Sequence, residues 1–170
     1  MHALMSAGER NGRARLLIAE LVARHGLFAN WDRQDWAEVI AELPIQKGLS
    51  FPVTLAFRNE NELLIEVADF RRILTPWPGA GAERLFVRIV DGLLSGRVRI
   101  RRHLVRTGRP WRVVLEEFDP DIGWCHLAHK LHMQALPFLA LLGHGQEILC
   151  NDPGFRPIRL ISDGGRLLRN

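Results

Sequence analysis

The chain has 170 residues, a formal net charge of +4, and 47% hydrophobic and 25% charged residues. This length suits a single domain with a hydrophobic core, and the composition argues against disorder over most of the chain. No run of residues approaches the ~20 apolar positions of a membrane-spanning helix, and the N-terminus lacks the apolar segment of a secretory signal. We therefore expect one cytoplasmic domain over 1–170, with 1–5 disordered.

Cysteine and arginine usage narrows the class of protein further. Two cysteines, Cys125 and Cys150, cannot form a disulfide framework, so reduced thiols are expected, with one disulfide between them as the alternative. Arginines outnumber lysines by 21 to 2, which is typical of a GC-rich, bacterial genome. The alternative is selection for contacts with anions, because the planar guanidinium group pairs with phosphate and carboxylate groups through two hydrogen bonds.

The first two predicted elements are helices. Ser6 and Glu9 match the capping box, and the apolar periodicity that follows predicts a helix over 7–25, which Gly26 ends. The next segment predicts a second helix that ends at Pro44, because its apolar residues recur at i, i+3, i+4 and i+7. These apolar residues are Trp36, Val39, Ile40 and Leu43.

Two hairpins are predicted farther along the chain. The β-prone runs over 51–57 and 62–70 are separated by polar, turn-prone residues. A second pair of runs, over 97–106 and 111–118, is separated by a turn that contains glycine and proline. Because hairpins build antiparallel sheets, the helices are expected to pack on one face of such a sheet.

A glycine-rich loop over 75–81 and a third helix over 82–94 lie between the two hairpins. Two glycines before a helix are typical of anion-binding loops, because exposed amides at a helix start attract negative charge. The dinucleotide fingerprint is incomplete here, since Arg84 occupies its third glycine position, and Glu83 in the first helical turn would repel a phosphate. We therefore interpret the segment as an ordinary loop.

The last part of the chain predicts a fourth helix over 123–142, kinked or restarted at Pro137, and then three short strands over 146–150, 157–162 and 166–170. The apolar face of this helix comprises Trp124, Leu127, Ala128, Leu131, Ala135, Phe138, Leu139 and Leu142. The complete pattern predicts an α+β fold, with an antiparallel sheet of about four to six strands and about three or four helices packed on one face.

The start of the predicted fourth helix concentrates metal-ligating residue types. Cys125, His129 and His132 lie at i, i+4 and i+7 and share one stripe of that helix. Cysteine and histidine are usual zinc ligands, but a structural zinc ion takes four ligands, and one helix brings three such side chains to one ion only with difficulty. We expect flanking residues of an amphipathic helix and no cofactor. A zinc site, or a metal- or thiol-dependent enzyme that uses this stripe, is the alternative.

An arginine-rich hairpin is the second candidate site, because positive side chains on one face of a strand attract anions. Trp77 in its loop and Trp111 beside the hairpin turn are expected to be partly exposed, where aromatic rings flanked by arginine make interface contacts. The residues predicted to bind a ligand or partner are Arg97, Arg99, Arg101, His103, Trp77 and Trp111.

Acidic residues on the returning strand limit the positive charge of this hairpin. If its turn pairs Arg106 with Trp111, Arg101 lies opposite Glu116, and the opposite charges stabilise the hairpin. We predict a non-enzymatic binding domain that recognises an anionic small molecule or an acidic protein partner through the hairpin. A nucleic-acid-binding protein is a further alternative, a membrane partner is not expected, and a homodimer remains open.

Overall fold

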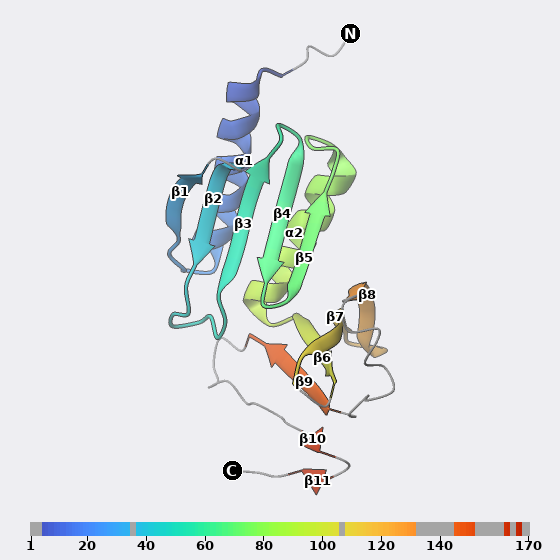
Figure 1. Cartoon of the computed structure of the whole chain (residues 1–170). Coiled ribbons are helices and arrows are strands. Elements are labelled where there is room, and N and C mark those ends of the chain that lie inside the picture. The colour runs from blue at the N-terminus through green and yellow to red at the C-terminus, as the bar shows by residue number, and fades with distance from the viewer. Residues whose placement is uncertain are drawn as a thin grey trace.

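The computed structural model describes residues 5–34, 37–105, 108–131, 145–151, 162–163 and 166–167. Within these residues the chain forms two α-helices and two antiparallel sheets, which confirms the α+β class (Figure 1). The two sheets follow each other along the chain, and helix α2 (Ala80–Ser95) connects them.

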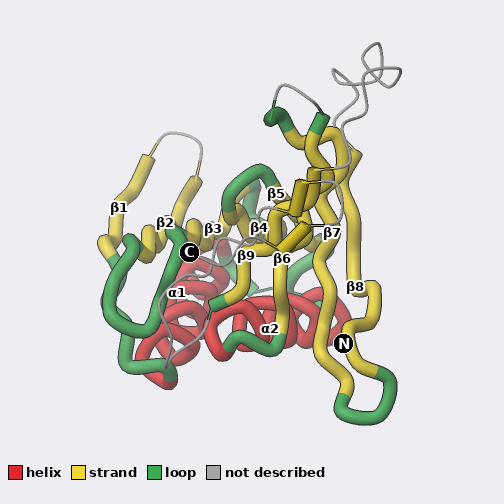
Figure 2. Tube along the Cα trace, turned by 90° about the horizontal axis from the view of Figure 1, so that it is seen from below, coloured by secondary structure: helices red, strands yellow, loops and turns green. Residues whose placement is uncertain are grey.

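The first sheet is a five-stranded meander in which each strand pairs antiparallel with the next. Its strands are β1 (Asn30–Gln34), β2 (Ala37–Leu43), β3 (Val53–Arg58), β4 (Glu62–Val67) and β5 (Phe70–Leu74). Helix α1 (Ala7–Arg24) precedes the sheet and α2 follows it, and both helices cover the same face (Figure 2).

The main hydrophobic core lies between these helices and the first sheet, as the apolar patterns of α1 and α2 predict. The capping box is confirmed, because the Ser6 side chain accepts from the Glu9 amide while the Glu9 carboxylate binds the Ser6 amide. Gly96 ends α2 in the left-handed conformation, with φ of 78°. The largest contributors to this core include Ile18, Leu21, Leu55, Phe57, Leu63, Ile65, Phe86 and Ile89.

The predicted second helix is wrong, because this segment is strand β2. Val39 faces the helices and is 6% exposed, while Ile40 faces the opposite side and is 0% exposed. On that side Ile40 joins Ala56 and Leu64 in a small separate cluster. A strand buried on both faces loses the alternation of apolar and polar residues, and its apolar positions then match helical spacing. Trp36 lies outside the described residues.

The second sheet has the strand order β11-β10-β9-β6-β7-β8. Its strands are β6 (Val98–Leu104), β7 (Pro110–Asp119), β8 (Gly123–Leu131), β9 (Gly145–Cys150), β10 (Ser162–Asp163) and β11 (Arg166–Leu167). Strands β6 and β7 form the predicted second hairpin. Val98, Ile100, Val113 and Leu115 extend the main core from α2 into this sheet.

The predicted fourth helix is also wrong, because its first part is the edge strand β8, which pairs with β7. A β-bulge inserts one extra residue into β8 relative to β7. As a result Cys125 and Ala128 face one side of the sheet although they are three residues apart, and His126 and His129 face the other. Side chains three residues apart also share a face in a helix, which explains why the sequence pattern predicted one here. The rest of the predicted helix, 132–142, lies outside the described residues.

Other elements agree more closely with expectation. The hairpin of β3 and β4, the helix α2 and the strand β9 match predicted segments, whereas β5 was not predicted as a separate strand. The expected three or four helices are not found, since the described residues hold two, and the helices cover the first of two sheets rather than a single sheet. Neither helix in the described part of the chain is long and apolar enough to cross a membrane.

Candidate binding face

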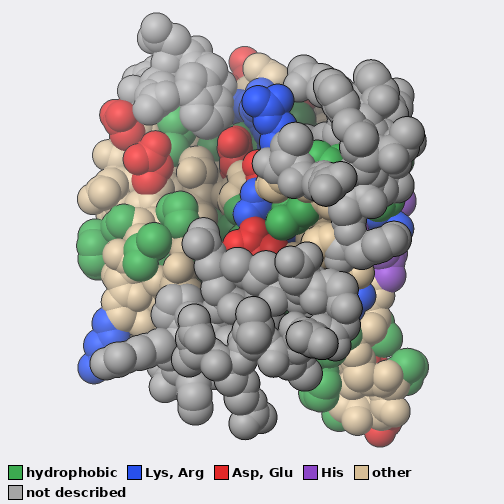
Figure 3. Space-filling model, turned by 60° about the horizontal axis from the view of Figure 1, so that its bottom comes forward, with side chains coloured by type: hydrophobic (Ala, Val, Ile, Leu, Met, Phe, Trp, Pro, Cys, Tyr) green, Lys and Arg blue, Asp and Glu red, His purple; other side chains and the backbone are tan. Residues whose placement is uncertain are grey.

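The outer face of the second sheet carries most of the predicted arginine row. Along β6, Val98 and Ile100 are fully buried toward the core, so Arg99, Arg101 and His103 point to the opposite side of the sheet. We call this surface the arginine face and define it by Arg99, Arg101, His103, Arg112, Glu116 and Trp124. Figure 3 shows basic and acidic side chains next to each other in the middle of the view, with histidines at its margin.

Glu116 of β7 lies at the centre of the arginine face. Its Oε2 accepts hydrogen bonds from Arg99 Nε at 2.7 Å and from Arg101 Nη2 at 2.9 Å. The Arg99 guanidinium group also lies over the Trp124 ring, 4.1 Å from its centroid, and Phe118 contacts the same ring. The predicted register is wrong by two residues, because Arg99 rather than Arg101 lies opposite Glu116. One carboxylate therefore neutralises part of the charge of two arginines.

His103 lies at the far end of this face, opposite Arg112 on β7. Burial, together with the nearby Arg112 and Arg101 guanidinium groups, lowers the pKa of His103 below its usual value, and Glu116 offsets this only in part. The His103 ring lies 5.7 Å from the Trp111 ring, measured between centroids. At neutral pH the positive charge of the face therefore comes from its arginines.

We expect acidification to destabilise the fold through His103. Because the pKa of His103 is lower in the folded than in the unfolded chain, the unfolded chain binds the proton first, and stability is lost as the pH falls through about 6.5. Urea unfolding of His103→Asn should therefore show a smaller loss of stability between about pH 7.5 and about pH 5.5 than the wild type does. His129→Asn, on the exposed surface of β8, is the matched control. A wild-type pH dependence in His103→Asn would contradict the argument.

Two predicted binding residues lie away from the arginine face. Arg97 precedes β6 and forms an ion pair with Asp91 of α2. The expected exposure of Trp77 is wrong, because its side chain is 1% exposed and packs edge-on against Phe57 with ring centroids 4.9 Å apart. Its indole Nε1 donates to a Glu83 carboxylate oxygen at 3.2 Å, which satisfies its polar atom and lets the ring enter the core.

The predicted cysteine–histidine stripe is not formed as one surface. Because β8 is a strand, Cys125 faces the core side of the sheet and His129 faces the outer side, while His132 lies outside the described residues. His129 instead approaches His126, with 3.3 Å between Nδ1 and Nε2. Among the described side chains, no three His, Cys, Asp or Glu residues group closely enough to hold a metal ion. The described residues therefore do not bring Cys125 and His129 together as ligands of one zinc ion.

Sequence reasoning missed Arg112 and Trp124 as members of the arginine face. The alternation along β7 was a sufficient signal for Arg112, since even-numbered residues of β7 share a face with odd-numbered residues of β6. No pattern in the sequence indicated Trp124, because the apolar residues of its segment recur at helical spacing. The comparisons add no relative from which a site could be transferred: no family model, curated protein or solved structure matches this chain.

Proposed function

We propose that the chain is a non-enzymatic binding module that docks an acidic protein on the arginine face. The observation that carries this proposal is the alignment of Arg99, Arg101 and Arg112 on one sheet face, opposed by Glu116 alone among the described residues of β6 to β9. Positive charge gathered in this way attracts acidic surfaces and increases the rate of their encounter.

The shape and chemistry of the face favour a protein over a small anion as the partner. Small ligands bind in concave sites that enclose most of their surface, whereas the arginines of this face form a row along two adjacent strands. Aromatic rings next to arginines, as at Trp124, are typical of the residues that contribute most to protein–protein affinity. We therefore propose a small anion only as the second candidate partner.

Arg112 offers the sharpest test, because no ion pair or hydrogen bond joins its side chain to another described residue, whereas Arg99 and Arg101 support Glu116. We expect a hexaglutamate peptide to shift the backbone amide resonances of β6, β7 and β8, with affinity that falls as salt rises. Arg112→Glu should weaken this binding about fivefold, the effect of roughly 1 kcal/mol at a partly exposed charge.

The matched control is Arg84→Glu, the same charge reversal at an exposed position of α2. Equal losses in both variants would mean that net charge, rather than the arginine face, attracts the peptide, and would contradict the proposal. If inorganic phosphate shifted the same amide resonances to saturation, the proposed partner would be a small anion instead of an acidic protein. Binding of a single-stranded oligonucleotide that is stronger and more salt-dependent than that of the peptide would instead support the nucleic-acid alternative.

A further inference from the structure

Strand β5 is an open edge of the first sheet. Among the described strands it pairs with β4 alone, so the backbone amides and carbonyls on its other side have no strand partner. Three consecutive residues of β5, Arg71, Arg72 and Ile73, have exposed side chains. An edge of this kind accepts an extended segment of another chain through ordinary ladder hydrogen bonds.

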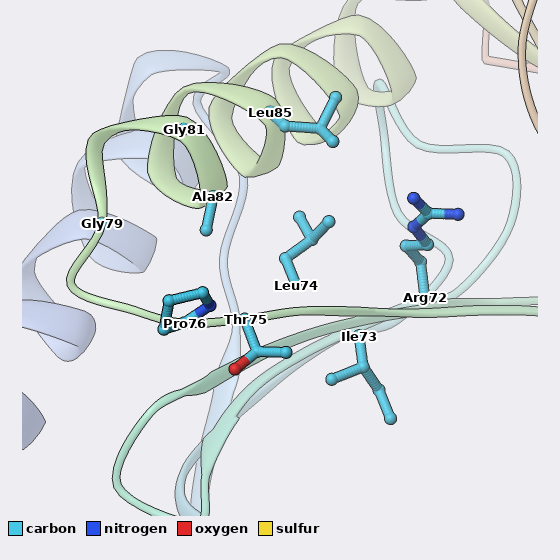
Figure 4. A pocket seen from close by; sticks show the side chains of 9 residues that line it. All are labelled: Arg72, Ile73, Leu74, Thr75, Pro76, Gly79, Gly81, Ala82 and Leu85. Atoms are coloured by element: carbon cyan, nitrogen blue, oxygen red, sulfur yellow. The ribbon is translucent and has the colours of Figure 1, made fainter.

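A cavity of about 490 Å³ lies beside this edge, between β5 and the start of α2. Its lining is mainly apolar and includes Leu74 and Pro76 below and Ala82 and Leu85 above (Figure 4). Leu74 points toward α2 (Figure 4). A strand added to β5 would direct every second side chain to this same side, where the cavity has room for an apolar group.

Arg72 is the one cation among the described residues that line this cavity. Figure 4 shows that the side chains of Arg72 and Leu74 lie on the α2 side of β5, whereas that of Ile73 lies on the other side. No ion pair or hydrogen bond joins the Arg72 side chain to another described residue, whereas Arg71 lies 3.8 Å from Glu66. An acidic side chain on an added strand, two residues from the apolar one, would face Arg72.

We propose that β5 and this cavity receive an extended, acidic segment of a partner protein as an additional strand of the first sheet. The partner's segment carries an apolar residue opposite Leu74 and an acidic residue opposite Arg72, at positions i and i+2. This inference does not depend on the arginine face, which lies on the second sheet.

The charge of β5 argues against a second copy of this chain as the occupant. Arg72 is the middle residue of the five in β5. Symmetric antiparallel pairing of two β5 strands would therefore place Arg72 directly opposite its own copy, and like charges at such positions are destabilising. An acidic strand removes this repulsion and gains an ion pair instead.

The probe for the test is an acetylated, amidated octapeptide in which every second residue is threonine. The residues between the threonines are leucine and glutamate in alternation, so that leucine and glutamate lie at positions i and i+2. We expect it to shift the β5 amide resonances and to slow their hydrogen exchange. Arg72→Glu should weaken binding of this peptide about tenfold, and should improve binding of a peptide with lysine in place of glutamate. Replacing the leucines of the peptide by serine should abolish binding, because nothing then fills the cavity.

Arg112→Glu is the matched control, and it should leave binding of the octapeptide unchanged while it weakens hexaglutamate binding. Absence of any β5 shift at millimolar octapeptide would overturn the inference and leave the arginines of β5 as protection against edge pairing. Equal affinity for the glutamate and lysine peptides would also overturn it. A dimer in solution whose β5 amides are protected without peptide would assign the edge to a second copy.

Discussion

Replacing Asn151 by aspartate is expected to lower the free energy of unfolding by about 3–5 kcal/mol, because one buried and one partly buried carbonyl group lose their donor at once. Asn151 follows β9 and is 1% exposed. Its Nδ2 donates to the carbonyl oxygens of Gly48 at 2.7 Å and Leu94 at 2.6 Å, and its Oδ1 accepts from the Ser50 amide at 2.9 Å. One side chain thus joins β9 to the loop before β3 and to the last turn of α2.

The pH dependence of this loss identifies its cause. A carboxylate in place of the amide faces two carbonyl oxygens, so burial and repulsion raise its pKa in the folded chain, and the folded chain then binds the proton more tightly than the unfolded chain does. The deficit of Asn151→Asp relative to the wild type should therefore be smaller at about pH 4.5 than at about pH 8 in urea titrations.

Ser50→Ala is the control for Asn151, because it removes a hydroxyl contact of 3.3 Å but keeps the backbone amide that Oδ1 binds. We expect it to cost less than about 1 kcal/mol. If Asn151→Asp were as stable as Ser50→Ala at both pH values, the two hydrogen bonds that Nδ2 donates would not hold the second sheet to the first.

Elements with a local cause were predictable from the sequence. Helix α1 begins where Ser6 and Glu9 satisfy each other's amides, and this reciprocal contact depends on residues three apart. The hairpins of β3 with β4 and of β6 with β7 likewise depend on short turns between β-prone runs. In each case the determining interaction lies within a few residues of the element.

Elements that depend on distant contacts were not predictable in this way. Strand β2 is buried on both faces, and β8 contains a bulge, so neither keeps the period of two that identifies a strand. The burial of Trp77 depends on Phe57 and Glu83, which approach it only in the folded chain. These failures share one cause, which is that tertiary packing overrides the local pattern.

The candidate site was likewise predictable only in those features that have a local cause. Alternation along β6 placed Arg99, Arg101 and His103 on one face, because that period is a property of the strand itself. The carboxylate that binds both arginines depends on register, which the turn between β6 and β7 determines, and the predicted register was wrong by two residues. A shift of two preserves which face each residue occupies, and so Glu116 remained on the arginine face.

Glu116→Gln is expected to destabilise the fold by about 2–4 kcal/mol, because it leaves two partly buried guanidinium groups without their carboxylate. The exposed fractions of the side chains are 11% for Glu116, 15% for Arg99 and 29% for Arg101, so water compensates only part of the loss. Urea unfolding measures this change, and the variant should show most of it even at high salt, since partly buried pairs are weakly screened.

The neighbouring residue supplies a matched control. Glu117 pairs with Arg88, whose side chain is 60% exposed, so Glu117→Gln should cost less than about 1 kcal/mol and should become neutral at high salt. A double-mutant cycle between Glu116→Gln and Arg99→Gln should give a coupling energy of about 1–3 kcal/mol. Additive effects of the two substitutions would show that the contacts of Glu116 contribute little to folding.

The variant Glu116→Gln also distinguishes the effect of Glu116 on stability from its effect on binding at the arginine face. Removing the Glu116 charge leaves the arginines unopposed, so Glu116→Gln should bind hexaglutamate more tightly than the wild type does, provided that circular dichroism shows it folded. Glu116 would then limit the affinity of the face for acidic partners in return for its contribution to stability. Weaker binding by a folded Glu116→Gln would instead mean that the carboxylate orients Arg99 and Arg101 for the partner, and that its charge is secondary.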